Sequence, residues 1–249
     1  MLMDRFEMFG SELYVLRTAH AGVDGDRVRR KILELDPEAV LVELCEGRLL
    51  SFLAELRGER AGSRTGGITG RLVAVAERIV GRVVGGELGE DVKGAIEAAL
   101  ELEAEIVPVD MDISWVFRRM KMKASRWELL KFQFSVAIDV LRSLLRPGQT
   151  RDVVLSSVAD EEAAREMVQG LRRAFPRIAE VLIDERNRVI AENTIEFLHS
   201  REDVTKAVLV IGAAHYGVLD ILRDAELESA SRHDDEDTAS GEGEEETAG

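Results

Sequence analysis

The sequence contains little cysteine and little proline, and it has no long hydrophobic run. Its single cysteine, Cys45, excludes an internal disulfide and fits a reducing compartment. No stretch approaches the roughly 20 consecutive apolar residues that a transmembrane helix needs. Acidic residues also occupy the first positions, where a signal peptide would be apolar. We therefore expect a cytoplasmic protein without a membrane span.

Positive charge is scarce relative to negative charge. The chain has 33 lysines and arginines against 48 aspartates and glutamates, a formal net charge of −15. Such a balance disfavours non-specific binding to nucleic acid, and an anionic membrane surface would repel the chain as a whole. Only six of the basic residues are lysines. Acidic, arginine-rich chains are typical of salt-loving cells, although GC-rich coding produces the same arginine bias.

Short apolar runs at both ends of the chain predict the strands of a buried sheet. Residues 12–19, 39–44 and 207–211 are rich in β-branched and other apolar side chains, as in parallel strands covered on both faces. A further strand is expected over 105–111, where Pro108 favours an edge position. Helical patterns separate these runs. The sequence therefore predicts one α/β domain, with a small, mostly parallel sheet flanked by many helices.

The remaining segments complete the expected organisation over residues 1–229. Residues 1–11 are expected to be a polar lead-in, and the five glycines of Gly58–Gly70 predict a flexible loop or lid. Residues 230–249 are acidic, lack large apolar side chains and predict a disordered tail. Helices are expected at 27–35, up to about 57, and at 71–84, 91–103, 113–123, 127–145, 159–173, 177–200 and 218–228.

Three chemically capable side chains follow three predicted strands. His20 follows the first strand, Glu43 belongs to the end of the second, and His215 follows the last. Open α/β folds bind their ligands at the carboxyl ends of the strands, so we expect these residues to meet there. The competing interpretation is that each histidine is a hydrogen-bonded residue at the rim and that Glu43 caps a helix.

Six stretches of the sequence, spread over about 200 residues, resemble one protein family, the TraB/PrgY family. It is related to the TIKI proteins and, more distantly, to the erythromycin-esterase-like and ChaN-like folds. The matching stretches are Leu16-Arg-Thr-Ala-His20, Val42-Glu-Leu-Cys-Glu-Gly-Arg48, Gly89–Ala99, Val109-Asp-Met-Asp-Ile113, Ile183-Asp-Glu-Arg-Asn-Arg188 and Ile211-Gly-Ala-Ala-His215.

The resemblance implies an α/β fold with two Gly-x-x-His signatures and a glutamate. Through the TIKI proteins it also implies a divalent-metal-dependent, peptidase-like activity. His20, Glu43 and His215 would then be metal ligands, since two imidazoles and a carboxylate suit an ion such as Mn²⁺, Co²⁺ or Zn²⁺ with an open water position. The first signature departs from the family, because Arg17 stands where the family has glycine.

Five more charged residues are candidates for the site. Arg48, after the second strand, could clamp a substrate carboxylate or orient Glu43, or could form an ordinary surface ion pair. Glu185 and Arg186 lie in a predicted helix, where a charge run is usually a solvated face. The matching family motif lies at the same place, so both residues could instead face the site. Asp110 and Asp112 could add a metal ligand or cap a helix.

These observations lead to one main functional hypothesis and two alternatives. The main hypothesis is a metal-dependent hydrolase acting on a peptide or another small substrate. A metal-independent hydrolase with a histidine base, as in the esterase-like relatives, is the first alternative. The second is a pheromone-shutdown-type protein that binds peptides without cleaving them. Several aromatic residues between Trp115 and Phe134 could line a peptide groove or simply pack, and a homo-oligomer is compatible with the sequence.

Overall fold

A five-stranded sheet forms the centre of the computed structural model, which describes residues 1–18, 25–58, 89–145 and 161–241. The strand order is β1-β2-β5-β3-β4. Four strands run parallel, and β1 pairs antiparallel with β2. The strands are β1 (Leu2–Met8), β2 (Ser11–Thr18), β3 (Ala39–Val42), β4 (Glu105–Pro108) and β5 (Lys206–Gly212). The predicted α/β domain with a small, mostly parallel sheet is confirmed.

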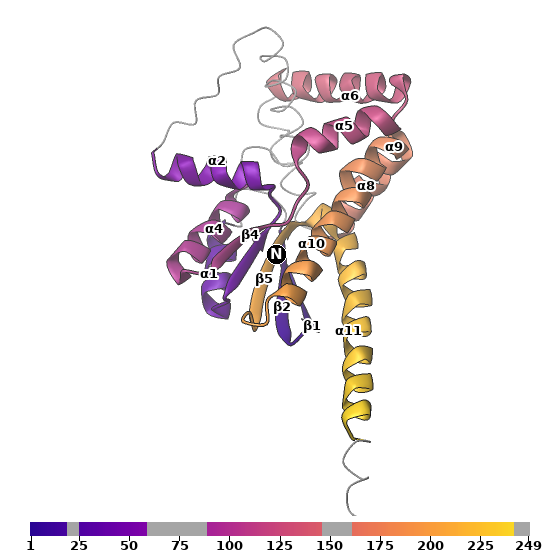
Figure 1. Cartoon of the computed structure of the whole chain (residues 1–249). Coiled ribbons are helices and arrows are strands. Elements are labelled where there is room, and N and C mark those ends of the chain that lie inside the picture. Colours follow the sequence, from indigo (N-terminus) through magenta and orange to yellow (C-terminus); the bar gives the residue numbers. More distant parts are fainter. Residues whose placement is uncertain (19–24, 59–88, 146–160, 242–249) are drawn as a thin grey trace, which may run out of the picture.

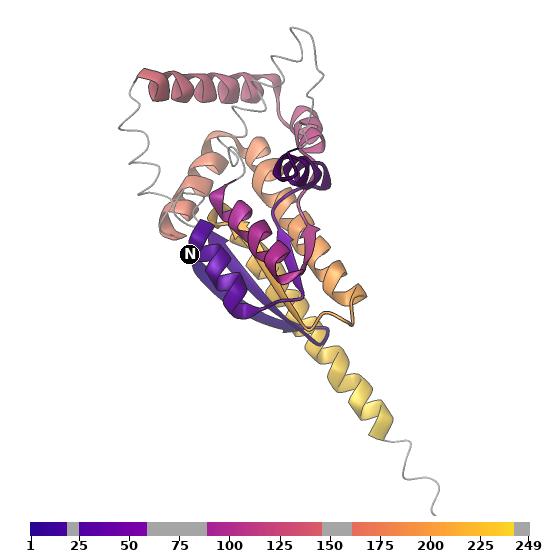
Figure 2. The same cartoon turned by 90° about the vertical axis from the view of Figure 1, so that its left-hand side faces the viewer.

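Helices cover both faces of the sheet (Figures 1 and 2). Val208 and Val210 of β5 pack in one core with α1 (Gly25–Leu35) and α4 (Glu90–Leu102). Leu209 and Ile211 pack on the other face with α10 (Arg186–Ser200) and α11 (Gly217–Gly241). A central strand with both faces buried must be apolar at every position, which explains the unbroken run that predicted it.

A separate helical layer lies beyond the carboxyl ends of the parallel strands (Figure 1). It has its own apolar core, which includes Val116, Phe132, Val168 and Leu182. The helices of this layer are α5 (Ile113–Lys123), α6 (Arg126–Leu145), α8 (Glu161–Ala174) and α9 (Pro176–Ala179). At the same end of the molecule, α2 (Glu46–Leu56) follows β3. The sheet edge that was expected to hold the site therefore faces this layer.

The expected polar lead-in at residues 1–11 is wrong, because β1 occupies most of it. Phe6 and Met8 are buried, while Met3 and Glu7 on the opposite face are exposed, as suits an edge strand covered on one face. Phe9 and Gly10 both have positive φ angles, and Met8 pairs with Ser11. Two positive φ values in a two-residue loop make a type I′ hairpin turn, which fixes the register of β1 against β2.

The expected helix from Arg177 to Ser200 is interrupted. It begins as α9 and passes through a π-helical segment, η1 (Glu180–Glu185), before α10 begins at Arg186. A π-helical turn widens the helix and rotates the residues that follow, and such turns are frequent at functional sites. Sequence periodicity does not reveal this feature.

The other expected elements agree within a few residues, including the edge position of β4. The last helix is longer than expected, since it continues to Gly241 instead of ending at Glu228. The expected helix at 71–84 and nearly all of the Gly58–Gly70 loop lie outside the described residues. The boundary of a disordered tail at residue 230 stays a prediction. None of the helices in the described ranges combines the length and hydrophobicity that a bilayer crossing requires.

Candidate functional site

The ends of two neighbouring parallel strands bring Glu43 and His215 together. Glu43 directly follows β3, and His215 closes a short 3-10 turn, η2 (Ala213–His215), after β5. β3 and β5 are adjacent and parallel, so their carboxyl ends share one edge of the sheet. Both side chains are buried, with 7% of Glu43 and 3% of His215 exposed. The expected placement of these two residues at the strand ends is confirmed.

Glu43 is held by three polar partners. Its Oε2 accepts a hydrogen bond from the backbone N–H of Gly212 at 2.7 Å, and its Oε1 accepts one from Nη2 of Arg186 at 2.6 Å. The same Oε1 lies 3.1 Å from Nε2 of His215. Glu43 is therefore not the cap of α2 that the competing interpretation expected. It joins the end of β5 to the start of α10 across the sheet edge.

His215 is oriented by an amide. Its Nδ1 lies 2.6 Å from Oδ1 of Asn187, which is itself buried at the start of α10. Nδ1 is thus placed to donate to the carbonyl oxygen of Asn187, and Nε2 on the other side of the ring faces the carboxylate of Glu43. A Cβ atom at Gly217 would come within 2.7 Å of Nδ2 of Asn187. Glycine at 217 therefore leaves room for the amide that positions the imidazole.

Arg186 lies between two carboxylates. Its Nε and Nη2 bind the two oxygens of Asp110 at 3.0 and 2.7 Å, and Nη2 also binds Glu43. Burial by itself would lower the pKa of Arg186, but the charges of Asp110 and Glu43 outweigh burial, and the pKa is raised. The guanidinium therefore stays charged and compensates the two buried acids.

Two hydrogen bonds position the segment after β4, one to the segment after β3 and one to α10. Asp110 follows β4, and its backbone N–H donates to the carbonyl of Leu44. Asn193 of α10 donates its side-chain amide to the carbonyl of Val109, which ties the helix to the same loop. Rotation by η1 directs Arg186 and Asn187 to the sheet edge while Glu185 is directed to another helix. The cluster thus draws on β3, β4, β5 and α10.

Glu185, a sequence-predicted candidate, lies apart from this cluster. Its two oxygens bind Arg119 at 2.9 and 2.8 Å, and Lys123 lies 2.5 Å away. The hydrogen bond from Arg119 is the main reason that the pKa of Glu185 falls to about 2, with Lys123 adding to the effect and burial opposing it. In this structure Glu185 joins η1 to α5, which is a structural role.

Arg48 and His20 differ in how the structure places them. Arg48 is half-exposed in the first turn of α2, and within the described ranges no side-chain contact joins it to Glu43, Arg186 or His215. His20 lies outside the described residues. The strand before it, β2, ends at Thr18, which pairs with Gly212 at the end of β5. β2 therefore ends at the same sheet edge that holds Glu43 and His215.

Arg17, the departure from the family signature, joins two strands. It lies within β2 and is buried, and its Nε and Nη2 bind Oδ2 of Asp4 at 3.0 and 2.9 Å. Asp4 belongs to the neighbouring edge strand β1. The effect of Arg17 on the turn before His20 concerns residues outside the described ranges.

Two residues of the cluster were missed or assigned otherwise from the sequence. Asn187 was not singled out, although it stands inside the stretch Ile183–Arg188. Asp110 was expected to be a helix cap or a metal ligand, and instead it binds Arg186. Asp112 does cap α5, accepting from the backbone N–H of Ser114 at 2.8 Å. Hydrogen bonds from the hydroxyl and then the backbone N–H of Ser114 lower the pKa of Asp112. The signal for Asp110 was its position after a strand.

A divalent ion fits part of this donor set. Ligand atoms about 2.1 Å from one ion lie about 3.0–3.4 Å apart at right or tetrahedral angles, and Glu43 Oε1 and His215 Nε2 are 3.1 Å apart. Histidines that bind a metal through one ring nitrogen usually hydrogen-bond a protein oxygen through the other, and Nδ1 of His215 contacts Oδ1 of Asn187 in this way. In the described ranges, no group of three His, Cys, Asp or Glu side chains is arranged to hold an ion.

The described sheet and helices lie in a region of the chain that matches a known protein-family model. The model of the TraB/PrgY/gumN family matches residues 3–228. The chain belongs to the TraB/PrgY/gumN family. This match covers every strand of the sheet and nearly all of the described helices, so the resemblance noted on six short stretches extends to the whole domain. No curated protein matches this TraB/PrgY/gumN chain.

Proposed function

We propose that the protein is a divalent-metal-dependent hydrolase of peptide-like substrates, with its centre at Glu43 and His215. The observation that carries the proposal is the approach of Nε2 of His215 to within 3.1 Å of a carboxylate oxygen of Glu43. In a neutral ring that donates from Nδ1 to Asn187, Nε2 keeps a lone pair, and two lone-pair atoms this close repel each other unless a cation lies against both. A metal ion satisfies this requirement, and His20 follows the end of β2 in the sequence.

The residues of the chain would then divide the work. Glu43 and His215, with His20, would hold the ion, which when bound polarises a carbonyl and makes a bound water more acidic. Asn187 would fix the imidazole, and Arg186 would hold Glu43 in place while adding positive charge near an oxyanion or a substrate carboxylate. Arg48 at the start of α2 stays a candidate for contact with the substrate.

A metal-independent hydrolase is the second candidate, and one observation favours it. Arg186 already places a cation 2.6 Å from the Glu43 oxygen that a metal would use. Protonation of Nε2 would let His215 donate to that oxygen without an ion, and the ring could then exchange a proton with a water or a substrate as general acid and base. Glu43 would orient and stabilise the imidazolium.

Metal binding separates the two candidates. We expect the purified full chain, titrated calorimetrically with Mn²⁺, Co²⁺ and Zn²⁺, to bind at least one of them, and His215→Ala and Glu43→Gln to abolish this binding. Asn187→Ala should weaken binding about 10–100-fold, because it removes the hydrogen bond that orients the imidazole of His215. The matched control is His199→Ala, since His199 is an exposed histidine on α10. Equal affinities in His215→Ala and wild type would exclude the proposed ligand set.

Cleavage of a mixed peptide library tests turnover. Wild-type cleavage that stops on chelation and returns with the metal supports the metal-dependent hydrolase, and His215→Ala should be inactive in the same assay. Cleavage that survives chelation but not His215→Ala supports the metal-independent candidate. Peptide binding without any cleavage difference between wild type and His215→Ala would mean a binding protein, and the proposal would be wrong.

A further inference from the structure

The outer helical layer exposes an unusual number of large apolar side chains. Three of them, Met122, Trp127 and Phe134, are 68%, 75% and 71% exposed. Both tryptophans of the chain belong to this group. The apolar residues of what we name the α5–α6 face are Trp115, Met122, Trp127, Leu130, Phe134 and Ile138. Exposed patches of this kind mark sites of interaction with another surface.

On α6 the exposed residues form one stripe. Trp127, Leu130, Phe134 and Ile138 are spaced by three or four residues, so they share one side of the helix. The opposite side carries Phe132 and Val136, which pack into the core of the helical layer with Leu129. Because α6 already has its core-facing side, the exposed stripe is a second apolar side with no role in the packing described.

Basic residues border this stripe. Arg126 and Lys131 are exposed beside it on α6, and Arg118 and Lys121 are exposed on α5. Arg118 lies over the ring of Trp115, 5.4 Å from its centroid. Between Ile113 and Val136 the one acidic residue is Glu128, which accepts backbone hydrogen bonds from Arg177 and Ile178 at the start of α9. The α5–α6 face is therefore basic and apolar, in a chain whose net charge is −15.

We propose that the α5–α6 face docks in the plane of a bilayer surface that carries anionic lipid. A helix with tryptophan, phenylalanine and leucine on one side and lysine or arginine along its borders has the composition of interfacial helices. The apolar stripe would enter the boundary between headgroups and acyl chains, and the basic residues would contact lipid phosphates. No helix in the described ranges could cross the bilayer, so docking would be peripheral.

Charge also distinguishes this partner from a second copy of the chain. Two copies paired in parallel through α6 would bring Arg126 and Lys131 of each stripe close to the same cations of the other, and like charges in an interface oppose association. An anionic lipid surface complements them instead. The stripe has no alternating charges of the kind that select a partner helix.

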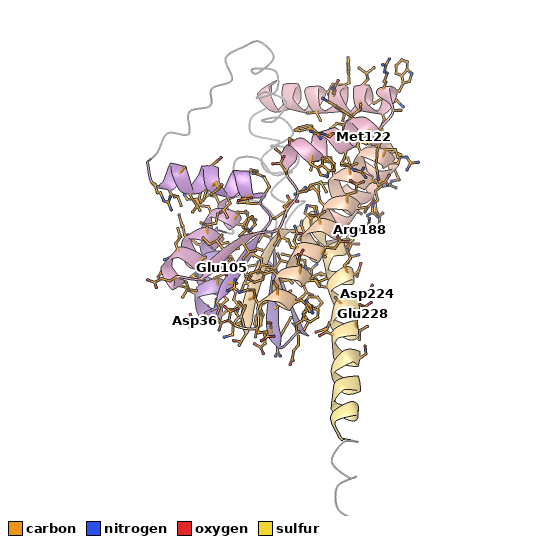
Figure 3. The ribbon with its side chains drawn as sticks, in the orientation of Figure 1. Asp36, Glu105, Met122, Arg188, Asp224 and Glu228 are labelled. Atoms are coloured by element: carbon orange, nitrogen blue, oxygen red, sulfur yellow. The ribbon has the colours of Figure 1, made fainter. Side chains whose placement is uncertain are left out.

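Several acidic residues lie away from this face. In Figure 3, Met122 marks the α5–α6 end of the molecule, while Asp36, Glu105, Asp224 and Glu228 lie toward the other end. Charges on a protein surface act on a bilayer within about 8–10 Å at physiological salt. The expectation that an anionic membrane would repel the chain as a whole therefore does not apply to this face.

Flotation with lipid vesicles tests the proposal on the full chain. We expect it to float with vesicles of equal amounts of phosphatidylglycerol and phosphatidylcholine, but not with phosphatidylcholine alone, and to be released by high salt. Arg126→Gln with Lys131→Gln should weaken binding about 25-fold, since each basic residue contributes about fivefold. Trp127→Ser and Phe134→Ser should each weaken it at least about tenfold. Tryptophan emission should shift to the blue on binding, because both tryptophans lie on this face.

The matched control changes exposed residues of the same kinds on α11. Arg223 is partly exposed and Leu227 is exposed, so Arg223→Gln with Leu227→Ser should leave vesicle binding unchanged. Circular dichroism checks that each variant is folded. Failure to float with anionic vesicles, equal binding to neutral ones, or equal loss in the control would overturn the proposal. So would a concentration-dependent dimer in sedimentation that Phe134→Ser dissolves, without vesicle binding.

Discussion

At the scale of single residues, Arg186 is the residue on which the candidate site depends most. It is 5% exposed and is the shared partner of Glu43 and Asp110. Removing the guanidinium would leave two buried carboxylates facing each other without a compensating charge. The Asn187–His215 contact depends less on a compensating charge, because both partners can be neutral.

We expect Arg186→Met to lower the free energy of unfolding by about 3–5 kcal/mol, the usual effect of breaking a buried ion pair from one side. Urea denaturation would measure this loss. Arg188→Met is the matched control, since Arg188 is exposed two residues further along α10 (Figure 3), and its effect should stay within about 0.5 kcal/mol. Similar losses in both variants would contradict the role given to Arg186.

At the scale of elements, the π-helical turn η1 joins the sheet edge to the outer helical layer. Its last residue, Glu185, binds Arg119 and Lys123 of α5, and the next residue, Arg186, binds Glu43. Successive side chains therefore hold two different layers. A shift of α5 would be transmitted to the site through this turn.

The Glu185 contacts predict a dependence of stability on pH. The pKa of Glu185 is lowered from 4.5 to about 2, so its ionised form stabilises the folded state. That contribution is complete above about pH 4.5 and is lost as the pH falls toward about 2. Wild type should therefore exceed Glu185→Gln in unfolding free energy by about 3 kcal/mol at most near neutral pH. Denaturation curves should show this difference shrinking below pH 4.5, and a constant difference would contradict it.

The crossing of α1 and α4 gives a second prediction at this scale. A Cβ atom at Gly94 would come within 2.3 Å of the carbonyl oxygen of Gly25, which is a backbone atom. We expect Gly94→Ala to destabilise the fold by about 1–3 kcal/mol through overpacking. At Gly170, within α8, an added Cβ meets nothing within 4 Å, and Gly170→Ala should stabilise by about 0.5–1 kcal/mol. Thermal unfolding of both variants would reveal the opposite signs.

At the scale of the whole molecule, the sequence predicted the buried sheet better than its borders. The strands ending at Val42 and Gly212 are almost continuous apolar runs, because a strand covered on both faces leaves little place for polar side chains. β2 was recognised from its apolar residues 13–16, although it also contains Glu12 and Arg17. β1 was missed because one of its faces is exposed, so its mixture of polar and apolar residues is compatible with coil. The position of β5 between β2 and β3 depends on pairing between distant segments.

The same limit applies to the candidate site. Glu43 and His215 could be placed from the sequence, since each follows a recognisable strand. Asn187 and the partners of Asp110 and Glu185 could not, because they depend on a π-helical turn that tertiary packing selects over the α-helix. Sequence periodicity describes which side of a helix is apolar. It does not describe a rotation of the helix after one wide turn.

The central strand of the sheet is the last strand to be synthesised. β5 spans Lys206–Gly212, yet it separates β2 from β3 and supplies the N–H that holds Glu43. On the ribosome, earlier segments of the chain would expose two apolar strand edges until this segment emerges and inserts, and unpaired edges favour aggregation. Rapid synthesis of the last third of the polypeptide, or chaperones that hold the incomplete sheet, should therefore govern the yield of folded protein in the cell.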